Sequence, residues 1–265
     1  MNKSSLLRRK ILEIAYRSNA SHVGSSLSIV EILSAVYRSV DITKIIDSHP
    51  DRDRVILSKG HSAAALYVVL NYYGLLSDEE LKTFYSNNSL LGGHATHNVK
   101  HIEHSTGALG HGLSVAVGIG IGFKAKKMNS HVYAIVGDGE LHEGSNWEAL
   151  LLAGHRNLNN ICILVDNNRL SGIGATNNCC NLDSLKKKFE AFGFLAFELD
   201  GHDEEAIYST IQNTKDLDKP VALVCNTVKG KGVSFMENNN VWHYRPPDKE
   251  AYENAIRELE KAEER

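Results

Sequence analysis

The sequence lacks the features that mark several classes of protein. It holds only 4 prolines and 4 cysteines in 265 residues, and its formal net charge is −3. This charge gives no basic footprint of the kind that nucleic-acid-binding domains carry. No apolar run approaches the roughly 20 residues that a membrane-spanning helix needs. We therefore expect neither nucleic acid nor a membrane as a partner.

The N-terminus and the cysteines indicate the cellular compartment in which the protein is expected. Residues 1–10 carry charges with no apolar core behind them, which is unlike a secretory signal. Cys162 and Cys225 lie in apolar runs and are expected to be small core residues. The adjacent pair Cys179 and Cys180 has neither zinc-ligand nor redox-motif spacing, and its role is open. A reducing cytoplasm is the expected location.

Helical and strand-like segments alternate along the whole chain. There are no internal repeats, no low-complexity tracts and no linker rich in Pro, Gly or Ser. We expect one α/β domain over residues 1–265, a doubly wound, mostly parallel sheet with helices on both faces. Asp248 is expected to cap a C-terminal helix over 248–263, whose many charges suggest a solvated face.

The most informative stretch predicts a βαβ unit. Residues 131–136 are β-branched, aromatic and apolar, which favours a strand. Residues 143–155 have a helical pattern, and 161–165 form the short apolar run expected of a buried parallel strand. A right-handed crossover brings the ends of both strands to one edge of the sheet. Asp138 and Asn168 each follow a strand, so they are expected to converge there, where open α/β sheets bind ligands.

The residue types at this edge suit a metal and a phosphate. An Asp138 carboxylate and an Asn168 amide offer hard oxygen ligands, which Mg²⁺ or Ca²⁺ prefers. Gly137 and Gly139 allow a phosphate to approach the backbone, and the start of the next helix adds N–H donors. Gly-Asp-Gly alone is better explained as an ordinary loop. The Asn-Asn pair after the next strand favours a binding site.

These motifs resemble those of a known family. Gly137-Asp138-Gly139, 27 intervening residues and then Asn167-Asn168 are similar to the thiamine diphosphate (ThDP) motif. The surrounding residues resemble the transketolase family in particular: Glu143-Gly144, Glu148-Ala149 and Ala153-Gly154-His155. The resemblance implies that the carbonyl of Leu170 is the third metal ligand, beside Asp138 and Asn168. It also implies that Glu143 belongs to a carboxylate contact between active sites.

Further loops carry the same resemblance. They are Ser21-His22-Val23-Gly24, Ser58-Lys59-Gly60-His61, Gly93-His94, Thr106 to Gly112 and Trp242-His243. The resemblance implies that His22, His61, His94 and His243 are the proton-transfer set. It implies cofactor contacts from His61, Gly107, Ala108, Leu109, Gly137, Asp138, Gly139, Glu143, Asn168 and His243. Without it, His22 would be an ordinary loop histidine, and a helix-capping role for His61 would be as good an interpretation.

Four positions depart from the family pattern: Ser21 and Ser25 stand where glycine is usual, His111 replaces a glutamine, and Tyr244 replaces a glycine. Residues 21–28 are expected to form a small polar loop, with Ser28 and Glu31 as a capping box for a helix over 29–40. A zinc site at the four histidines between 94 and 104 is rejected, because the glycines there disfavour a helix and no cysteine or carboxylate cluster supports it.

The resemblance runs from about Ser21 to His243 and covers only the diphosphate-binding half of a transketolase. In the family, a pyrimidine-binding domain supplies the glutamate that activates the cofactor. The chain is therefore expected to be the N-terminal subunit of a split transketolase, inactive alone and assembled with a separate C-terminal-type subunit, as α₂β₂. The implied reaction is transfer of a two-carbon ketol unit between a ketose and an aldose, either sugar phosphates or a specialised sugar.

Two alternatives stay open. One is the α-subunit of a 2-oxo acid dehydrogenase, which shares the Gly-Asp-Gly and Asn-Asn motif. The other is a non-catalytic paralogue that only binds a partner. The Ser-Lys-Gly-His and Thr-Gly-Ala-Leu-Gly loops favour transketolase over the first, and the retained Asp138, Asn168 and loop histidines argue against the second. The donor and acceptor sugars are not indicated by the sequence.

Overall fold

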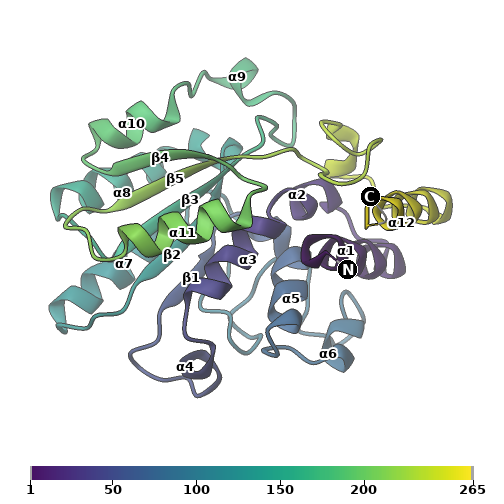
Figure 1. The fold of residues 1–265 in the computed structure, drawn as a ribbon, viewed down its shortest axis with the longest axis horizontal. Helices are drawn as coiled ribbons and strands as arrows, with labels where there is room; N and C mark the ends of the chain where they lie inside the picture. Colours follow the sequence, from purple (N-terminus) through teal and green to yellow (C-terminus); the bar gives the residue numbers. More distant parts are fainter. Residues whose placement is uncertain (1, 264–265) are drawn as a thin grey trace.

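The computed structural model describes residues 2–263. Its strands form one sheet of 5 parallel strands in the order β1-β2-β3-β5-β4 (Figure 1). The strands are β1 (Arg54–Leu57), β2 (Val132–Gly137), β3 (Ile161–Asn167), β4 (Leu195–Asp200) and β5 (Val221–Asn226). The predicted unit is present: β2 pairs with β3 in parallel, with Val136 opposite Val165. The prediction of a doubly wound parallel sheet is confirmed.

Helices cover both faces of the sheet (Figure 1). In residues 2–263 they are α1 (Lys3–Ser18), α2 (Val23–Ser28), α3 (Val30–Ser39), α4 (Ile42–Ile46), α5 (Ala63–Tyr72), α6 (Asp78–Lys82), α7 (Gly112–Ala125), α8 (Gly144–His155), α9 (Thr176–Cys179), α10 (Leu185–Ala191), α11 (Glu204–Thr214) and α12 (Lys249–Glu263), with short 3-10 turns η1 (Gly60–Ser62), η2 (Gly139–His142) and η3 (Asn240–His243). Alternate residues of the strands point to opposite faces. Ile135 packs in the core under α1, α3, α5 and α11, and Val136 in the core under α7, α8 and α10.

The N-terminal part of the site differs from the prediction. Residues 21–28, expected to be a loop, contain helix α2, which begins after His22. Ser28 does not cap the next helix, because Ile29 holds that position and makes no side-chain cap. The Ser28 hydroxyl instead donates to the buried carboxylate of Asp166 at 2.7 Å. The capping-box prediction is therefore wrong. Leaving the buried Asp166 charge without a hydrogen-bond donor would cost more free energy than leaving this helix end without a side-chain cap.

The C-terminal helix packs on the domain. Helix α12 begins after Asp248, as predicted, and it lies beside α1 (Figure 1). Ala255 and Leu259, one turn apart, are buried in the core, and Tyr252 stacks on Tyr16 with ring centroids 4.5 Å apart. The expectation of a simply solvated face is therefore wrong. Two small or branched apolar residues at i and i+4 are enough to give this charged helix a buried stripe.

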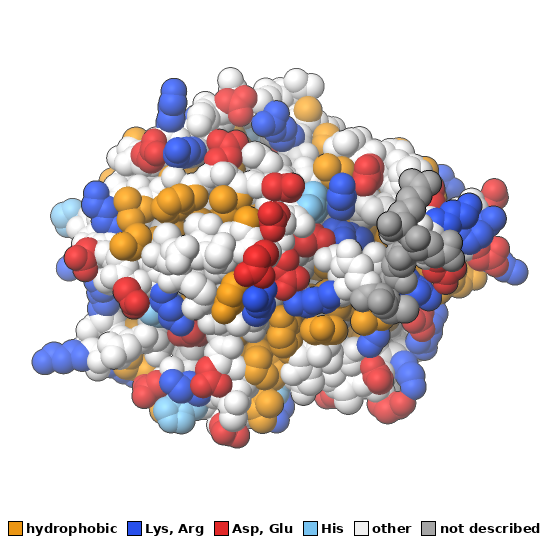
Figure 2. All heavy atoms as spheres, in the orientation of Figure 1, with side chains coloured by type: hydrophobic (Ala, Val, Ile, Leu, Met, Phe, Trp, Pro, Cys, Tyr) orange, Lys and Arg blue, Asp and Glu red, His pale blue; other side chains and the backbone are white. Residues whose placement is uncertain are grey.

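The surface carries both signs of charge. On the face shown in Figure 2, described Lys and Arg side chains are interspersed with Asp and Glu side chains. This agrees with the formal net charge of −3. Among residues 2–263, no helix is both long and apolar enough to cross a membrane.

Candidate active site at the carboxyl edge of the sheet

A cavity of about 550 Å³ opens where strands β2 and β3 end. Twelve of the residues predicted for the site line it: His22, His61, His94, Gly107, Leu109, Gly137, Asp138, Gly139, Glu143, Asn168, Leu170 and His243. Ala108, between two of them, is exposed and does not line the cavity. The volume is in the range of small-molecule and cofactor sites. The loops that follow separate strands thus meet at one edge, as the topology requires.

The four predicted histidines gather on one side of this cavity. The ring centroid of His22 lies 5.3 Å from that of His61, 5.8 Å from that of His94 and 5.0 Å from that of His243. The rings of His61 and His243 are 5.4 Å apart. These residues come from four segments widely separated in the sequence, so only the fold brings them together.

The backbone holds His22 in a strained conformation. Its φ is 65°, in the left-handed region that is uncommon for residues other than glycine. The His22 N–H donates to the carbonyl of His243 at 2.8 Å, which fixes the two segments to each other. Ser21 and Ser25, which stand where the family has glycine, contact these two histidines. Ser21 Oγ lies 3.1 Å from His22 Nδ1, and Ser25 Oγ lies 3.4 Å from His243 Nδ1. Such strain is found at sites where geometry matters for function.

Lys229 determines the tautomer of His243. Its buried ammonium donates to His243 Nδ1 at 2.9 Å, so the ring proton is on Nε2. The same ammonium donates to Asn240 Oδ1 at 3.0 Å and to the Ser171 carbonyl at 3.1 Å. Burial and the neighbouring Lys59 charge lower the pKa of Lys229 to about 8. Lys229 lies in the Lys-Gly-Lys-Gly segment after β5, and its role was not predicted from the sequence.

Three of these histidines, His22, His61 and His243, are neutral at pH 7. Burial, helped by the Lys229 charge, lowers the pKa of His243 to about 3. Burial and the neighbouring His94 lower the pKa of His22 to about 4. Burial and the Lys59 charge keep the pKa of His61 well below its usual value. Neutral rings can accept a proton, and an anion bound beside them would raise each pKa.

Asp138 has a carboxylate oxygen that is available to bind a cation. Its Oδ1 accepts the Gly139 N–H at 2.8 Å, whereas the buried Oδ2 has no hydrogen-bond partner among residues 2–263. Burial and the nearby Asp166 charge raise the pKa of Asp138 to about 6. Asn168 Oδ1 accepts one hydrogen bond, from the Leu170 N–H at 3.0 Å, which leaves it a second lone pair.

These donors fit a hard divalent cation. The cavity wall offers a carboxylate oxygen, an amide oxygen and the Leu170 carbonyl, which receives only a long 3.4 Å contact from Lys229. Within residues 2–263, no group of 3 or more His, Cys, Asp or Glu side chains is arranged to hold a metal. The fit to Mg²⁺ or Ca²⁺ therefore rests on one carboxylate with neutral oxygens.

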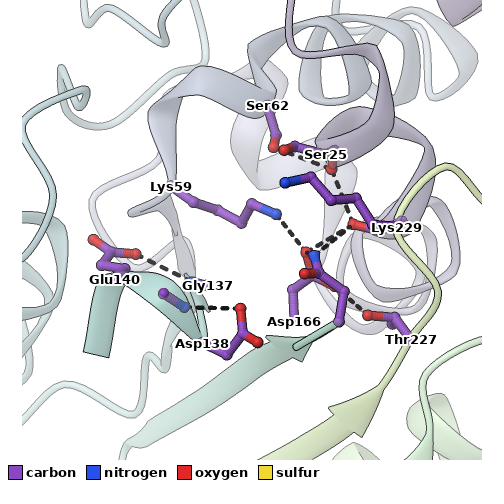
Figure 3. Close-up of polar contacts among 12 residues, drawn as sticks. Ser25, Lys59, Ser62, Gly137, Asp138, Glu140, Asp166, Thr227 and Lys229 are labelled. Carbon is purple, nitrogen blue, oxygen red and sulfur yellow. Dashed lines mark hydrogen bonds and ion pairs between the residues drawn. The ribbon is translucent and has the colours of Figure 1, made fainter. Parts of the chain in front are cut away.

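Asp166 supports this edge from inside the sheet, and its role was also not predicted. Its fully buried carboxylate pairs with the Lys59 ammonium and accepts a hydrogen bond from Thr227 (Figure 3). It also accepts hydrogen bonds from Ser28 and Asn168. The Asn168 bond, at 3.0 Å, comes from the amide nitrogen, so the amide oxygen, which accepts the Leu170 N–H, keeps a second lone pair for another contact. A charged residue at the end of an apolar strand could have indicated this, because a buried charge requires a partner.

Glu140 joins the Gly-Asp-Gly turn to a second loop. Its buried carboxylate accepts N–H bonds from Gly110 at 3.0 Å and from Gly137 at 3.2 Å. Gly110 has φ 82°, and a Cβ there would lie 2.6 Å from Glu143 Cβ, so only glycine fits. The His111 side chain, at the position of the family's glutamine, hydrogen-bonds the Ala108 and Leu109 carbonyls of the same loop.

The model of the transketolase thiamine diphosphate-binding domain matches residues 3–259. The chain belongs to this family. It is 40% identical over 256 residues to a subunit of the apulose-4-phosphate transketolase of Phocaeicola vulgatus, covering 95% of this chain and 90% of that one. It is 36% identical to the 6-deoxy-6-sulfo-D-fructose transketolase subunit SqwG of Clostridium sp. (strain MSTE9), covering 98% and 96%.

Among solved structures, the Campylobacter jejuni transketolase superposes with a TM-score of 0.88 at 30% identity. The match covers 98% of this chain but 43% of the Campylobacter chain. The chain thus matches these two separate transketolase subunits over nearly their whole length and spans under half of the Campylobacter transketolase. The predicted family and fold are confirmed, as is the prediction of an N-terminal transketolase-type transferase subunit.

Proposed function

We propose that the cavity binds ThDP with Mg²⁺ or Ca²⁺, and that the chain transfers a two-carbon ketol unit from a ketose to an aldose together with a separate pyrimidine-binding subunit. One observation carries the proposal. The unpartnered Asp138 oxygen and the cluster of His22, His61, His94 and His243 line the same cavity. A carboxylate oxygen available to a cation, with the neutral rings of His22, His61 and His243 at the same sheet edge, suits an anionic cofactor with proton transfers beside it.

In this proposal, Asp138, Asn168 and the Leu170 carbonyl hold the cation, and the backbone of Gly137 and Gly139 approaches the diphosphate. Bound ThDP supplies the electron sink for cleavage of the carbon–carbon bond of the ketose. Gly107 and Leu109 border the same space, as does Glu143, which is proposed to contribute to a contact between active sites.

The histidines are proposed to move protons of the substrate hydroxyl groups. His243 presents an Nε2–H because Lys229 occupies its Nδ1. His22 and His61 are neutral and can accept a proton from a substrate hydroxyl.

The names of two relatives support a proposal for the substrate and the partner. The relatives named apulose-4-phosphate and 6-deoxy-6-sulfo-D-fructose transketolase subunits act, by those names, on sugars with a phosphate or a sulfonate. We propose a sugar of this anionic kind, an α₂β₂ assembly and a cytoplasmic location. The separate subunit provides the pyrimidine-binding half of each active site.

The test uses the full chain with its purified partner subunit, Mg²⁺ and ThDP. Xylulose 5-phosphate and a panel of other anionic ketoses serve as donors, and the released aldehyde is measured. Transfer that requires both chains supports the proposal. Decarboxylation of a 2-oxo acid instead would identify the dehydrogenase-type activity. Absence of ThDP binding by the pair, measured by calorimetry, would favour a non-catalytic paralogue.

A further inference from the structure

Two adjacent thiols stand on the wall of the cofactor cavity. Cys179 ends helix α9 and Cys180 follows it, and both side chains are exposed and line the cavity. The other cysteines, Cys162 and Cys225, are buried in the core. Burial raises the pKa of the Cys162 thiol to about 12 and that of Cys225 well above its usual value. Reactivity toward oxidants requires an accessible thiolate, so it is confined to the exposed pair.

The thiol pair is joined to the segment that holds the proposed cation ligands. Leu170 forms a β-bridge with Ala175, and the Thr176 N–H donates to the Arg169 carbonyl at 3.0 Å. The Cys180 N–H donates in turn to the Thr176 carbonyl at 3.2 Å. Because these hydrogen bonds connect Cys180 to Leu170, a change in the backbone at Cys180 is expected to move the Leu170 carbonyl.

The pair is also joined to the Gly-Asp-Gly side of the cavity. His142, the last residue of η2, contacts the Cys180 carbonyl through its ring Nε2 at 3.0 Å. The turn η2 begins at Gly139, directly after Asp138. Cys180 is thus hydrogen-bonded to both the Asn168–Leu170 side and the Asp138 side of the proposed diphosphate site. A chemical change at the pair can therefore displace residues on either side of that site.

We propose that Cys179 and Cys180 form a peroxide-sensitive dithiol whose oxidation to a disulfide weakens cofactor binding; the second part rests on the ThDP function proposed above. One thiolate attacks a hydroperoxide, an S–O bond forms, the O–O bond breaks and the leaving oxygen departs as water or an alcohol. The second thiol then attacks that sulfur, an S–S bond forms and water leaves. Two thiols are oxidised and one peroxide is reduced, so the atoms and electrons balance.

A disulfide between neighbours changes the backbone. Across a trans peptide the Cα atoms are about 3.8 Å apart, which is shorter than the roughly 4.4–6.8 Å of ordinary disulfides. Rotation about φ and ψ leaves this separation unchanged, so the disulfide would be strained. Bringing the two sulfur atoms to bonding distance is expected to shift the backbone of Cys179 and Cys180 and to weaken the contacts of Cys180 with Thr176 and His142. A strained bond of this kind is also easily reduced by thiols, so the change is reversible.

The chemistry is tested on the full chain without any cofactor. Reduced protein is treated with hydrogen peroxide, then alkylated and analysed by peptide mass spectrometry. The expected product is a peptide holding both cysteines that has lost the mass of two hydrogen atoms and regains it with dithiothreitol. Cys162 and Cys225 stay reduced. Stable oxygen addition at a single thiol, a disulfide between two copies, or no reaction at the pair would each overturn the proposal.

The effect on binding is tested on the complex of the chain with its partner subunit. Oxidation is expected to weaken binding of Mg²⁺–ThDP roughly tenfold or more, as changes beside metal ligands do, and dithiothreitol should restore it. The C179S/C180S variant should bind in the same way before and after peroxide. A disulfide that forms without any change in affinity would overturn the second part. Failure of the reduced complex to bind ThDP would count against the proposed function instead, and the mass result would still stand.

Discussion

Replacement of Glu31 by glutamine is expected to remove a buried charge that ties three elements together. Glu31 lies on α3 and is 4% exposed. Its carboxylate accepts hydrogen bonds from Arg8 of α1 at 2.7 Å and from His202, after β4, at 3.1 Å. His202 Nε2 accepts the N–H of Val228 at 2.8 Å, so its Nδ1 carries the proton that is donated to Glu31. This chain of contacts ends at Val228, next to Lys229, whose ammonium contacts His243 of the cavity wall.

The magnitude follows from the carboxylate pKa. Burial acts to raise the pKa of Glu31, but His202 and Arg8 outweigh it and lower the pKa from 4.5 to about 2. The difference in pKa, at about 1.36 kcal/mol for each unit, corresponds to about 3 kcal/mol of stability at pH 7. Because the folded-state pKa is below the unfolded one, this stabilisation is complete above about pH 4.5 and is lost as the pH falls toward 2.

The assay is urea unfolding of the wild type and Glu31→Gln at several pH values. The variant should be less stable by about 3 kcal/mol at pH 7, and less than about half of that difference should remain at pH 3. Glu205→Gln is the matched control, because Glu205 pairs with Arg38 at 2.6 Å on the surface, with its side chain 69% exposed. It should not change the free energy of unfolding measurably. A Glu31→Gln difference that is the same at pH 7 and pH 3 would refute the electrostatic origin.

Three further changes separate catalysis, substrate access and packing. His22→Ala should lower kcat of the assembled enzyme by roughly 10²–10⁴-fold while ThDP affinity, measured by calorimetry, stays near wild type; an unchanged kcat would exclude a proton-transfer role. Tyr244→Gly should change KM for the sugars more than kcat. The reason is that the exposed Tyr244 ring lies at the cavity wall, with its centroid 4.6 Å from that of the His243 ring. Equal KM values in the variant and the wild type would argue against a role of Tyr244 in substrate access. Gly154→Ala should lower the free energy of unfolding by about 3 kcal/mol, because a Cβ there would lie 1.8 Å from the Phe192 carbonyl oxygen. Gly118→Ala is the control, because a Cβ at that position would meet nothing within 4 Å. It should be neutral or stabilising in the same unfolding assay.

The β2-α8-β3 unit could be predicted because its signals are local. A buried parallel strand is a continuous apolar run, and the residues that end it must lie at one edge of the sheet. Asp138 and Asn168 were placed correctly by this reasoning. The histidines needed the family resemblance, because nothing in the sequence near His22 or His61 indicates that their rings lie 5.3 Å apart.

The features that were missed depend on long-range contacts. Helix α2 consists of Val-Gly-Ser-Ser-Leu-Ser, a sequence of low helix propensity that is helical here because every residue of it is buried. Lys59 and Asp166 are 107 positions apart, and neither residue alone indicates the other. The burial of α12 depends on where α1 lies, which its own charge pattern does not reveal.

Metal-dependent ThDP binding by Asp138→Ala, measured by calorimetry on the complex with the partner subunit, tests the central claim most directly. In the wild type, binding should require Mg²⁺ and be abolished by a chelator. The variant should bind more than roughly a hundredfold more weakly, since it lacks the buried oxygen that has no partner in the described part of the chain. The exposed Asp47→Ala should bind as the wild type does. Unchanged affinity and unchanged Mg²⁺ dependence in Asp138→Ala would contradict the proposed site.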